Sequence, residues 1–98
     1  MNSTDACIEF AKALESGDGN VTTKRLRSCQ AWVMETPTHY LLQSYATIIA
    51  SINKQSGLCI DALRVVYGYT ATSAGHIAKF RRDYNARECY TLRSGFQK

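Results

Sequence analysis

The chain has 98 residues, of which 45% are hydrophobic and 20% are charged, with a net charge of +4 and one proline. This composition excludes a disordered or collagen-like protein, and the length allows one core. No run approaches the roughly eighteen apolar residues of a membrane-spanning helix. We therefore expect residues 1–98 to form a single domain, with a frayed tail at 94–98.

The N-terminal sequence and the cysteines bear on the compartment. The first ten residues contain no basic segment followed by an apolar run, so we expect no secretory signal and a cytoplasmic location. The four cysteines, at positions 7, 29, 59 and 89, are scattered, unlike the close ligand pairs of structural zinc sites. We interpret them as small buried hydrophobic residues, with a metal or redox role as the alternative.

The first predicted element is a helix at residues 4–16. Ser3 or Thr4 is expected to cap its first amides, and Gly17 to end it in the left-handed conformation. Four apolar residues share the i, i+3, i+4, i+7 spacing of one helical face: Cys7, Phe10, Ala11 and Leu14.

Strand character dominates the middle of the chain. Residues 22–30 fit both a helix and an extended segment, and the sequence leaves both open. Residues 31–36 predict a strand that Pro37 ends. Dense β-branched and aromatic residues at 40–52 and 58–68 predict two antiparallel strands, joined by a turn at 53–57.

A second helix is predicted after Thr70, whose hydroxyl can accept a hydrogen bond from the amide of Ser73. The face expected to pack on the sheet consists of Ser73, Ile77, Phe80 and Tyr84. The face expected to meet solvent consists of His76, Lys79, Arg82 and Asp83. Asn85 can end the helix in the left-handed conformation, and residues 87–93 alternate as a last strand.

This order of elements favours an α+β domain of two layers, an antiparallel sheet with two helices on one face. Unpaired sheet edges in a small strand-rich domain also favour a homodimer. We expect the edge to be the strand near 88–92 or the one at 31–36.

Two stretches, SYATIIASINKQSG at 44–57 and YGYTATSAGHIAKFRRDY at 67–84, carry a resemblance. They resemble a group of small proteins of bacteriophages and related mobile elements, which share a Ser-Tyr strand, a hairpin and a Tyr-Ser/Thr-x-Thr-Thr/Ser-x-x-His helix motif. Here the motif residues are Tyr69, Thr70, Thr72, His76, Lys79 and Phe80, and TPTHY at 36–40 is similar too. The resemblance covers about residues 32–93. It implies a phage or mobile-element origin, in the cytoplasm of an infected bacterial cell, and no particular chemistry.

Catalytic candidates are few, because the chain contains only two histidines, His39 and His76. Cys59 could pair with His76 if its strand abuts the helix, but an inert buried thiol is the simpler interpretation. The sequence has no glycine-rich phosphate loop and no GxSxG motif. We therefore expect a protein that is not an enzyme and that holds no cofactor or metal.

Charge and tyrosines point instead to binding. Residues 1–18 carry one lysine against four acidic residues, whereas residues 74–98 carry six basic residues against two acidic ones. The basic residues could contact phosphates or form a solvated face, and the tyrosines could bind a partner or pack on the core. The candidate residues for binding a partner or nucleic acid are Tyr67, Tyr69, His76, Lys79, Arg81, Arg82 and Arg87.

We accordingly expect a non-catalytic phage accessory protein that binds a host or phage protein complex and no membrane. Inhibition of a bacterial defence system, as by an anti-CRISPR protein, is one concrete form of this function. The alternative is a small nucleic-acid-binding accessory protein that uses the basic C-terminal helix, although a helix-turn-helix signature is missing.

Overall fold

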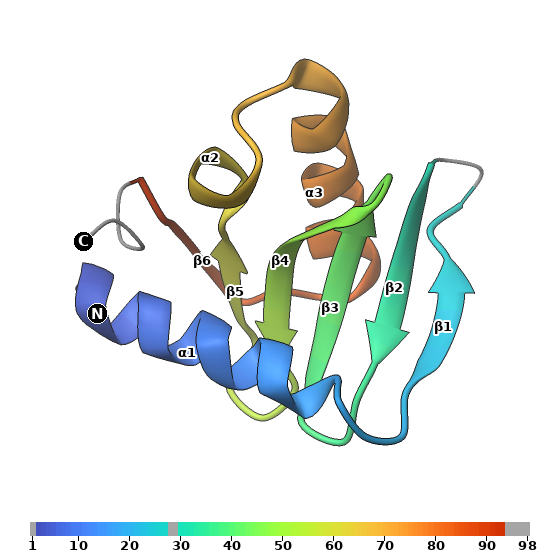
Figure 1. The fold of residues 1–98 in the computed structure, drawn as a ribbon, viewed down its shortest axis with the longest axis vertical. Helices are drawn as coiled ribbons and strands as arrows, with labels where there is room; N and C mark the ends of the chain where they lie inside the picture. Colours follow the sequence, from blue (N-terminus) through green and yellow to red (C-terminus); the bar gives the residue numbers. More distant parts are fainter. Residues whose placement is uncertain (1, 28–29, 94–98) are drawn as a thin grey trace.

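A six-stranded, mostly antiparallel sheet with three helices forms the described part of the chain, which confirms the α+β class (Figure 1). The structure is a computed structural model that describes residues 2–27 and 30–93. The elements are α1 (Ser3–Ser16), β1 (Thr22–Arg25), β2 (Ala31–Glu35), β3 (His39–Ser44), β4 (Thr47–Asn53), β5 (Leu58–Asp61), α2 (Leu63–Val66), α3 (Ala71–Asp83) and β6 (Glu88–Thr91). The predicted frayed tail and Cys29 lie outside the described residues. Within the described ranges, no helix has the length and apolar character to cross a membrane.

The strands lie in the sheet in chain order, from β1 at one edge to β6 at the other. Neighbouring strands are antiparallel except β5 and β6, which are parallel and are joined by a crossover through α2 and α3. The strand predicted at 31–36 is therefore not an edge, because β1 pairs with it, whereas the strand near 88–92 is one. Both edge strands are four residues long, and β1 carries Lys24 and Arg25, features that oppose pairing between sheets. The homodimer stays a prediction.

The two long helices lie on opposite faces of the sheet. Ile60 of β5 belongs to the same core cluster as Phe10 of α1, whereas the preceding residue, Cys59, belongs to the cluster that contains Phe80 of α3. Successive residues of a strand point to opposite faces, so α1 and α3 cover different sides. The expected two-layer arrangement, with both helices on one face, is therefore wrong.

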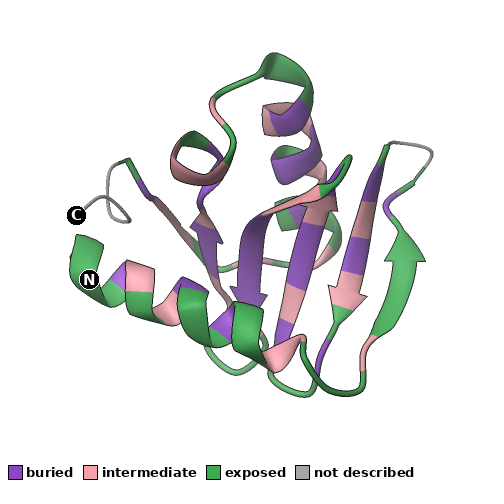
Figure 2. Ribbon diagram, in the orientation of Figure 1, coloured by how far each residue is buried: buried purple, intermediate pink, exposed green. Residues whose placement is uncertain are grey.

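The burial of β4 gives the reason for this arrangement. Its residues 49–52 are buried without interruption, so this strand needs a cover on each face. Figure 2 shows β4 as an almost continuously buried strand, whereas the edge strand β1 is exposed along its length.

The predicted strand at 40–52 is in fact two strands, β3 and β4. The chain reverses at Tyr45 and Ala46, where Tyr45 adopts the left-handed conformation with φ of 55°. The turn has no glycine, asparagine or proline, which are the residues that mark a tight turn in a sequence.

The predicted strand at 58–68 also divides, into β5 and the single turn of α2. The Asp61 side chain accepts a hydrogen bond from the amide of Leu63 at 3.1 Å, and the carbonyl of Ala62 accepts one from the amide of Val66 at 3.0 Å. Asp61 thus ends the strand and begins the helix through a local side-chain hydrogen bond.

The segment at 22–30, for which the sequence left helix and extended structure open, begins with the extended edge strand β1.

The ends of α3 follow the sequence closely. The hydroxyl of Thr70 accepts a hydrogen bond from the amide of Ser73 at 3.1 Å, and Asn85 takes the left-handed conformation with φ of 57°. Both predictions are confirmed, because each depends on one side chain and its own backbone.

The ends of α1 differ from expectation. Asn2, rather than Ser3 or Thr4, caps the helix, since its side-chain oxygen accepts from the amide of Asp5 at 2.9 Å. Gly17 has an ordinary right-handed conformation, with φ of −82°.

The buried face of α1 is also rotated from the predicted one. Of the four predicted residues, only Phe10 is buried; Cys7 is half-buried, and Ala11 and Leu14 are exposed. The face turned to the sheet consists of Ala6, Phe10 and Ala13, two of them small enough to let α1 approach closely.

The opposite placement of α1 and α3 makes both of their phenylalanines core residues. Phe10→Ala and Phe80→Ala should each lower the free energy of unfolding by about 3–5 kcal/mol, because each leaves a cavity under a different face. Ile8→Ala on α1 and Lys79→Ala on α3 are the matched controls and should cost under about 0.5 kcal/mol. Chemical denaturation measures all four; a Phe10 variant as stable as the Ile8 variant would contradict the placement of α1.

Candidate functional site

The two predicted binding tyrosines lie in the connection between α2 and α3. Tyr67 is 55% exposed and Tyr69 is 58% exposed, although both have large apolar rings. Gly68 between them has φ of 105°, which only glycine adopts without strain. The guanidinium of Arg64 in α2 lies 4.9 Å from the centre of the Tyr69 ring, a cation–π contact. Sequence analysis missed Arg64, which lies in the strand predicted at 58–68. Nothing in the sequence indicates that its side chain contacts the connection between α2 and α3.

A third exposed tyrosine, Tyr45, lies at the same end of the sheet. The β3–β4 turn that carries it and the α2–α3 connection both follow strands that run in one direction, β3 and β5 (Figure 1). Tyr45 is 49% exposed, and its left-handed backbone is unfavourable for a bulky residue. We call Tyr45, Tyr67 and Tyr69 the aromatic end.

His76 lies inside the protein and not on the solvent face. It is 4% exposed, and its Nδ1 lies 2.8 Å from the Ser44 hydroxyl, which in turn lies 3.0 Å from the Ser73 hydroxyl. The Tyr45 ring covers it, with ring centres 6.0 Å apart. The expectation that His76 lies on the solvent face of α3 is therefore wrong, because this ring is buried and hydrogen-bonds α3 to β3. Burial, helped by the charge of Lys79, lowers its pKa, so the ring is neutral at pH 7.

The predicted basic residues are only partly brought together. Arg81 and Arg82 are exposed and line one shallow hollow of about 320 Å³ with Ala78 and Ala86. Lys79 is half-buried on the same helix.

Arg87 is exposed but lines a different hollow, of about 330 Å³, beside the tyrosine pair Tyr40 and Tyr84. The structure therefore gives two adjacent arginines on α3 and a third in other surroundings, rather than one continuous basic stripe.

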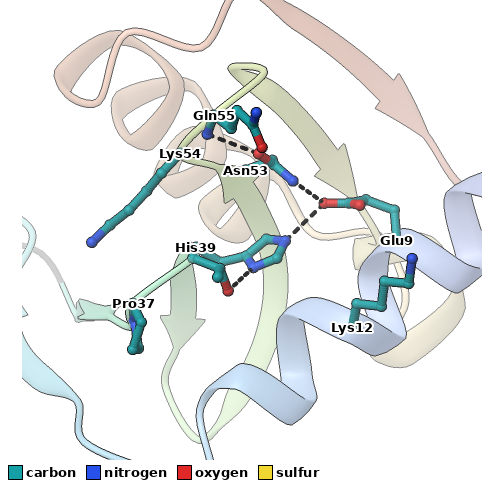
Figure 3. Close-up of a pocket in the computed structure, with 8 residues that line it drawn as sticks. Glu9, Lys12, Pro37, His39, Asn53, Lys54 and Gln55 are labelled. Carbon is teal, nitrogen blue, oxygen red and sulfur yellow. Dashed lines mark hydrogen bonds and ion pairs between the residues drawn. The ribbon is translucent and has the colours of Figure 1, made fainter.

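A cavity of about 590 Å³ lies at the opposite end of the sheet, where β3 begins and β4 ends beside α1 (Figure 3). We call it the α1 cleft. It contains none of the predicted binding residues, and most of its lining residues have polar or charged side chains. The lining residues are Glu9, Lys12, Pro37, Thr38, His39, Asn53, Lys54 and Gln55.

A chain of hydrogen bonds crosses the α1 cleft. The Thr38 hydroxyl lies 2.8 Å from Nδ1 of His39, and Nε2 of His39 lies 2.8 Å from Oε2 of Glu9. The Asn53 amide donates to the same Glu9 oxygen at 3.1 Å (Figure 3). A carboxylate accepts both bonds, so Nε2 of a neutral His39 carries the proton and Nδ1 accepts from Thr38.

This arrangement can polarise the Thr38 hydroxyl, the exposed member of the chain, while His39 is 5% exposed. Lys12 and Lys54 bring two cations to the lining, and the Lys54 ammonium donates to Glu35 at 2.7 Å. The α1 cleft can therefore accept a small hydrogen-bonding group. The sequence could not reveal it, because Glu9 and His39 are thirty positions apart and meet only when α1 crosses the sheet.

The structure also brings together two cysteines that appeared scattered in the sequence. Cys59 of β5 and Cys89 of β6 are direct neighbours in the sheet. The pairing of Cys59 with His76 is not formed, because His76 hydrogen-bonds to Ser44 instead. Among residues 2–27 and 30–93, no three histidine, cysteine or acidic side chains are grouped to hold a metal ion.

Comparison of the chain with protein-family models, with curated proteins and with solved structures finds no match. The function therefore has to follow from the surfaces and sites of this protein itself.

The Glu9 carboxylate should matter for stability because two donors depend on it. Glu9→Ala should cost about 1–3 kcal/mol of unfolding free energy, since it leaves the His39 ring N–H and the Asn53 amide without this acceptor. Lys12→Ala, on the same helix and in the same cleft, should cost under about 0.5 kcal/mol. Equal losses in urea melts would show that the chain of hydrogen bonds contributes nothing.

Burial of neutral His76 should make stability depend on pH. Its pKa is lowered in the folded protein, so below the ordinary histidine pKa of about 6.5 the unfolded chain binds more protons. Stability should therefore fall as the pH drops from 7 to 5, by at most about 1.4 kcal/mol per pH unit for one proton. His76→Gln should flatten this dependence. Identical pH profiles in denaturant melts would contradict the buried neutral ring.

Proposed function

We propose that this protein acts by binding another protein, which contacts the aromatic end. The observation that carries this proposal is that Tyr67 and Tyr69 are each more than half exposed, on one short connection. Tyrosines lose little conformational entropy when a partner covers them, because each has only two side-chain torsions. Covering such a ring contributes favourable burial, and tyrosine is enriched among the residues that dominate binding energy.

The chemistry beside the rings favours an acidic partner surface. Arg64 stacks its guanidinium over Tyr69, which leaves the edge of the guanidinium suited to a carboxylate. The net charge of +4 would also speed the encounter with an acidic protein. We therefore propose a partner that presents carboxylates around an apolar surface.

The resemblance to small phage and mobile-element proteins supports a more specific form of this proposal. In that form the partner is a host or phage protein complex in an infected bacterial cell. A bacterial defence complex such as a CRISPR effector is the example we favour, and the protein would inhibit it by occupying its surface. Inhibition by occupation needs no catalytic group.

A second candidate function, nucleic-acid binding, is favoured by the adjacent Arg81 and Arg82 on the exposed side of α3. Two guanidinium groups beside a shallow hollow can contact backbone phosphates. The separate position of Arg87 argues against a longer phosphate track, and α2 is only one turn long, unlike the first helix of a helix-turn-helix.

Protein binding predicts a loss concentrated at the aromatic end. Tyr67→Ala and Tyr69→Ala should each weaken binding by about 2 kcal/mol, about thirtyfold in Kd, without changing the melting temperature. Ile8→Ala on α1 removes an equally exposed apolar side chain away from this end and should leave Kd unchanged. The measurement is calorimetry against the partner identified by crosslinking in infected cells. If the Ile8 and tyrosine variants bind alike, the aromatic end is not the contact.

Nucleic-acid binding predicts a different pattern on the same preparations. Arg81→Ala and Arg82→Ala would then each lower the slope of log K against log salt by about 0.7–0.9, because each phosphate contact releases counterions. If the protein-binding proposal holds, DNA should bind no tighter than the nonspecific range of about 10⁻⁴ to 10⁻⁶ M. Sub-micromolar, salt-sensitive binding in a titration would overturn the first proposal in favour of the second.

A further inference from the structure

The register of the parallel strands sets two thiols opposite one another. In the β5–β6 ladder Cys59 is the direct partner of Cys89. Directly paired residues point to the same face, and neighbouring strands lie about 4.7–4.9 Å apart. That spacing falls within the range of about 4.4–6.8 Å between Cα atoms over which a disulfide can form.

The two thiols differ in their surroundings. Cys59 is fully buried in the core under α3, whereas Cys89 is half-buried on the edge strand β6. The two residues are direct partners in the ladder, and the positive charge of the Arg81 guanidinium acts on both thiols. Asp61 is the charged group that opposes Arg81.

The hydrogen bond from Cys59, together with the charge of Arg81, lowers the pKa of Cys89 to about 7. The same hydrogen bond and burial raise the pKa of Cys59, which therefore stays a thiol. The lowered pKa raises the share of Cys89 that is thiolate at neutral pH, and the thiolate is the nucleophile.

We propose that Cys59 and Cys89 form a reversible redox pair, in which Cys89 reacts with a hydroperoxide and Cys59 closes a disulfide between β5 and β6. This inference is independent of the proposed binding function. It uses Arg81, which sequence analysis selected for its charge, as the cation that favours the Cys89 thiolate.

The chemistry proceeds in two steps. The Cys89 thiolate attacks an oxygen of hydrogen peroxide and the O–O bond breaks, giving the sulfenic acid; the hydroxide that leaves becomes water with the proton that the Cys89 thiol released when it ionised. The Cys59 sulfur then attacks the Cys89 sulfur, the S–O bond breaks, and the departing hydroxide leaves as water with the proton of Cys59. Two thiols are oxidised to one disulfide, and one peroxide is reduced to two waters.

The disulfide would join the short edge strand β6 covalently to β5. It would close a covalent loop from residue 59 to residue 89, which contains α2, α3 and the α2–α3 connection. Closing a loop of this length restricts the unfolded chain, so the oxidised protein should melt at a higher temperature than the reduced one.

The reactivity of Cys89 is tested first, with Cys29→Ser in every protein so that three thiols can be followed by peptide mapping. At pH 7 iodoacetamide should alkylate Cys89 about threefold faster than an ordinary thiol, with Cys7 as the internal reference, because the larger thiolate fraction outweighs the lower nucleophilicity of each thiolate. Cys59→Ala and Arg81→Ala should each slow Cys89, because each removes a group that favours the thiolate. A Cys89 rate equal to that of Cys7, or unaffected by both substitutions, would overturn the assignment.

Oxidation is tested with one equivalent of hydrogen peroxide. Mass spectrometry should find a peptide linked through residues 59 and 89, which dithiothreitol reverses, and the Cys7→Ala protein should form it equally well. In the Cys59→Ala protein, dimedone should label Cys89 as the trapped sulfenic acid. If the Cys59→Ala protein does not fold, the presence or absence of the peptide linked through residues 59 and 89 in the Cys29→Ser protein still tests the proposal. Disulfides between chains, or oxidation of Cys7 before Cys89, would refute the pair.

Discussion

Burial of the central strands on both faces is the constraint from which the arrangement of this protein follows. Residues 49–52 of β4 are buried without interruption, so a single helical layer would leave one face of this strand in water. One core cluster forms under α1 and the other under α3, and adjacent residues of β5 contribute to different clusters. The sheet therefore separates α1 from α3, and each helix packs on its own core cluster.

Strand β3 carries the polar contacts that complete this arrangement. At its start, His39 hydrogen-bonds to Glu9 of α1; at its end, Ser44 hydrogen-bonds to His76 of α3 on the other face. Apolar contacts alone would allow each helix to slide along its face, whereas these bonds require one position. Both histidines of the chain thus fix helices, and the groups beside them, Thr38 and Tyr45, are exposed.

The sequence predicts well where one side chain decides the local backbone, as Thr70 and Asn85 do at the ends of α3. It fails where tertiary packing decides. The turn at Tyr45 has no local turn residue, and its left-handed backbone is held by the strands on either side. Likewise, periodicity could not show that β4 is buried on both faces. Tyr67 and Tyr69 of the aromatic end could be selected from the sequence as candidate binding residues. The roles of Arg64 and of the α1 cleft could not, because they depend on contacts that form only in the folded chain.

The parallel β5–β6 pair has a consequence for how the molecule forms and opens. The other strand pairs join segments that are neighbours along the chain, so they can close early as local hairpins. Strand β6 can join only after the crossover through α3 has brought residue 89 back to residue 59. Closing that longer loop comes late in folding, and a four-residue edge strand should be the first part to detach in the native protein. Its backbone amides should therefore exchange with solvent deuterium well before those of β3 and β4.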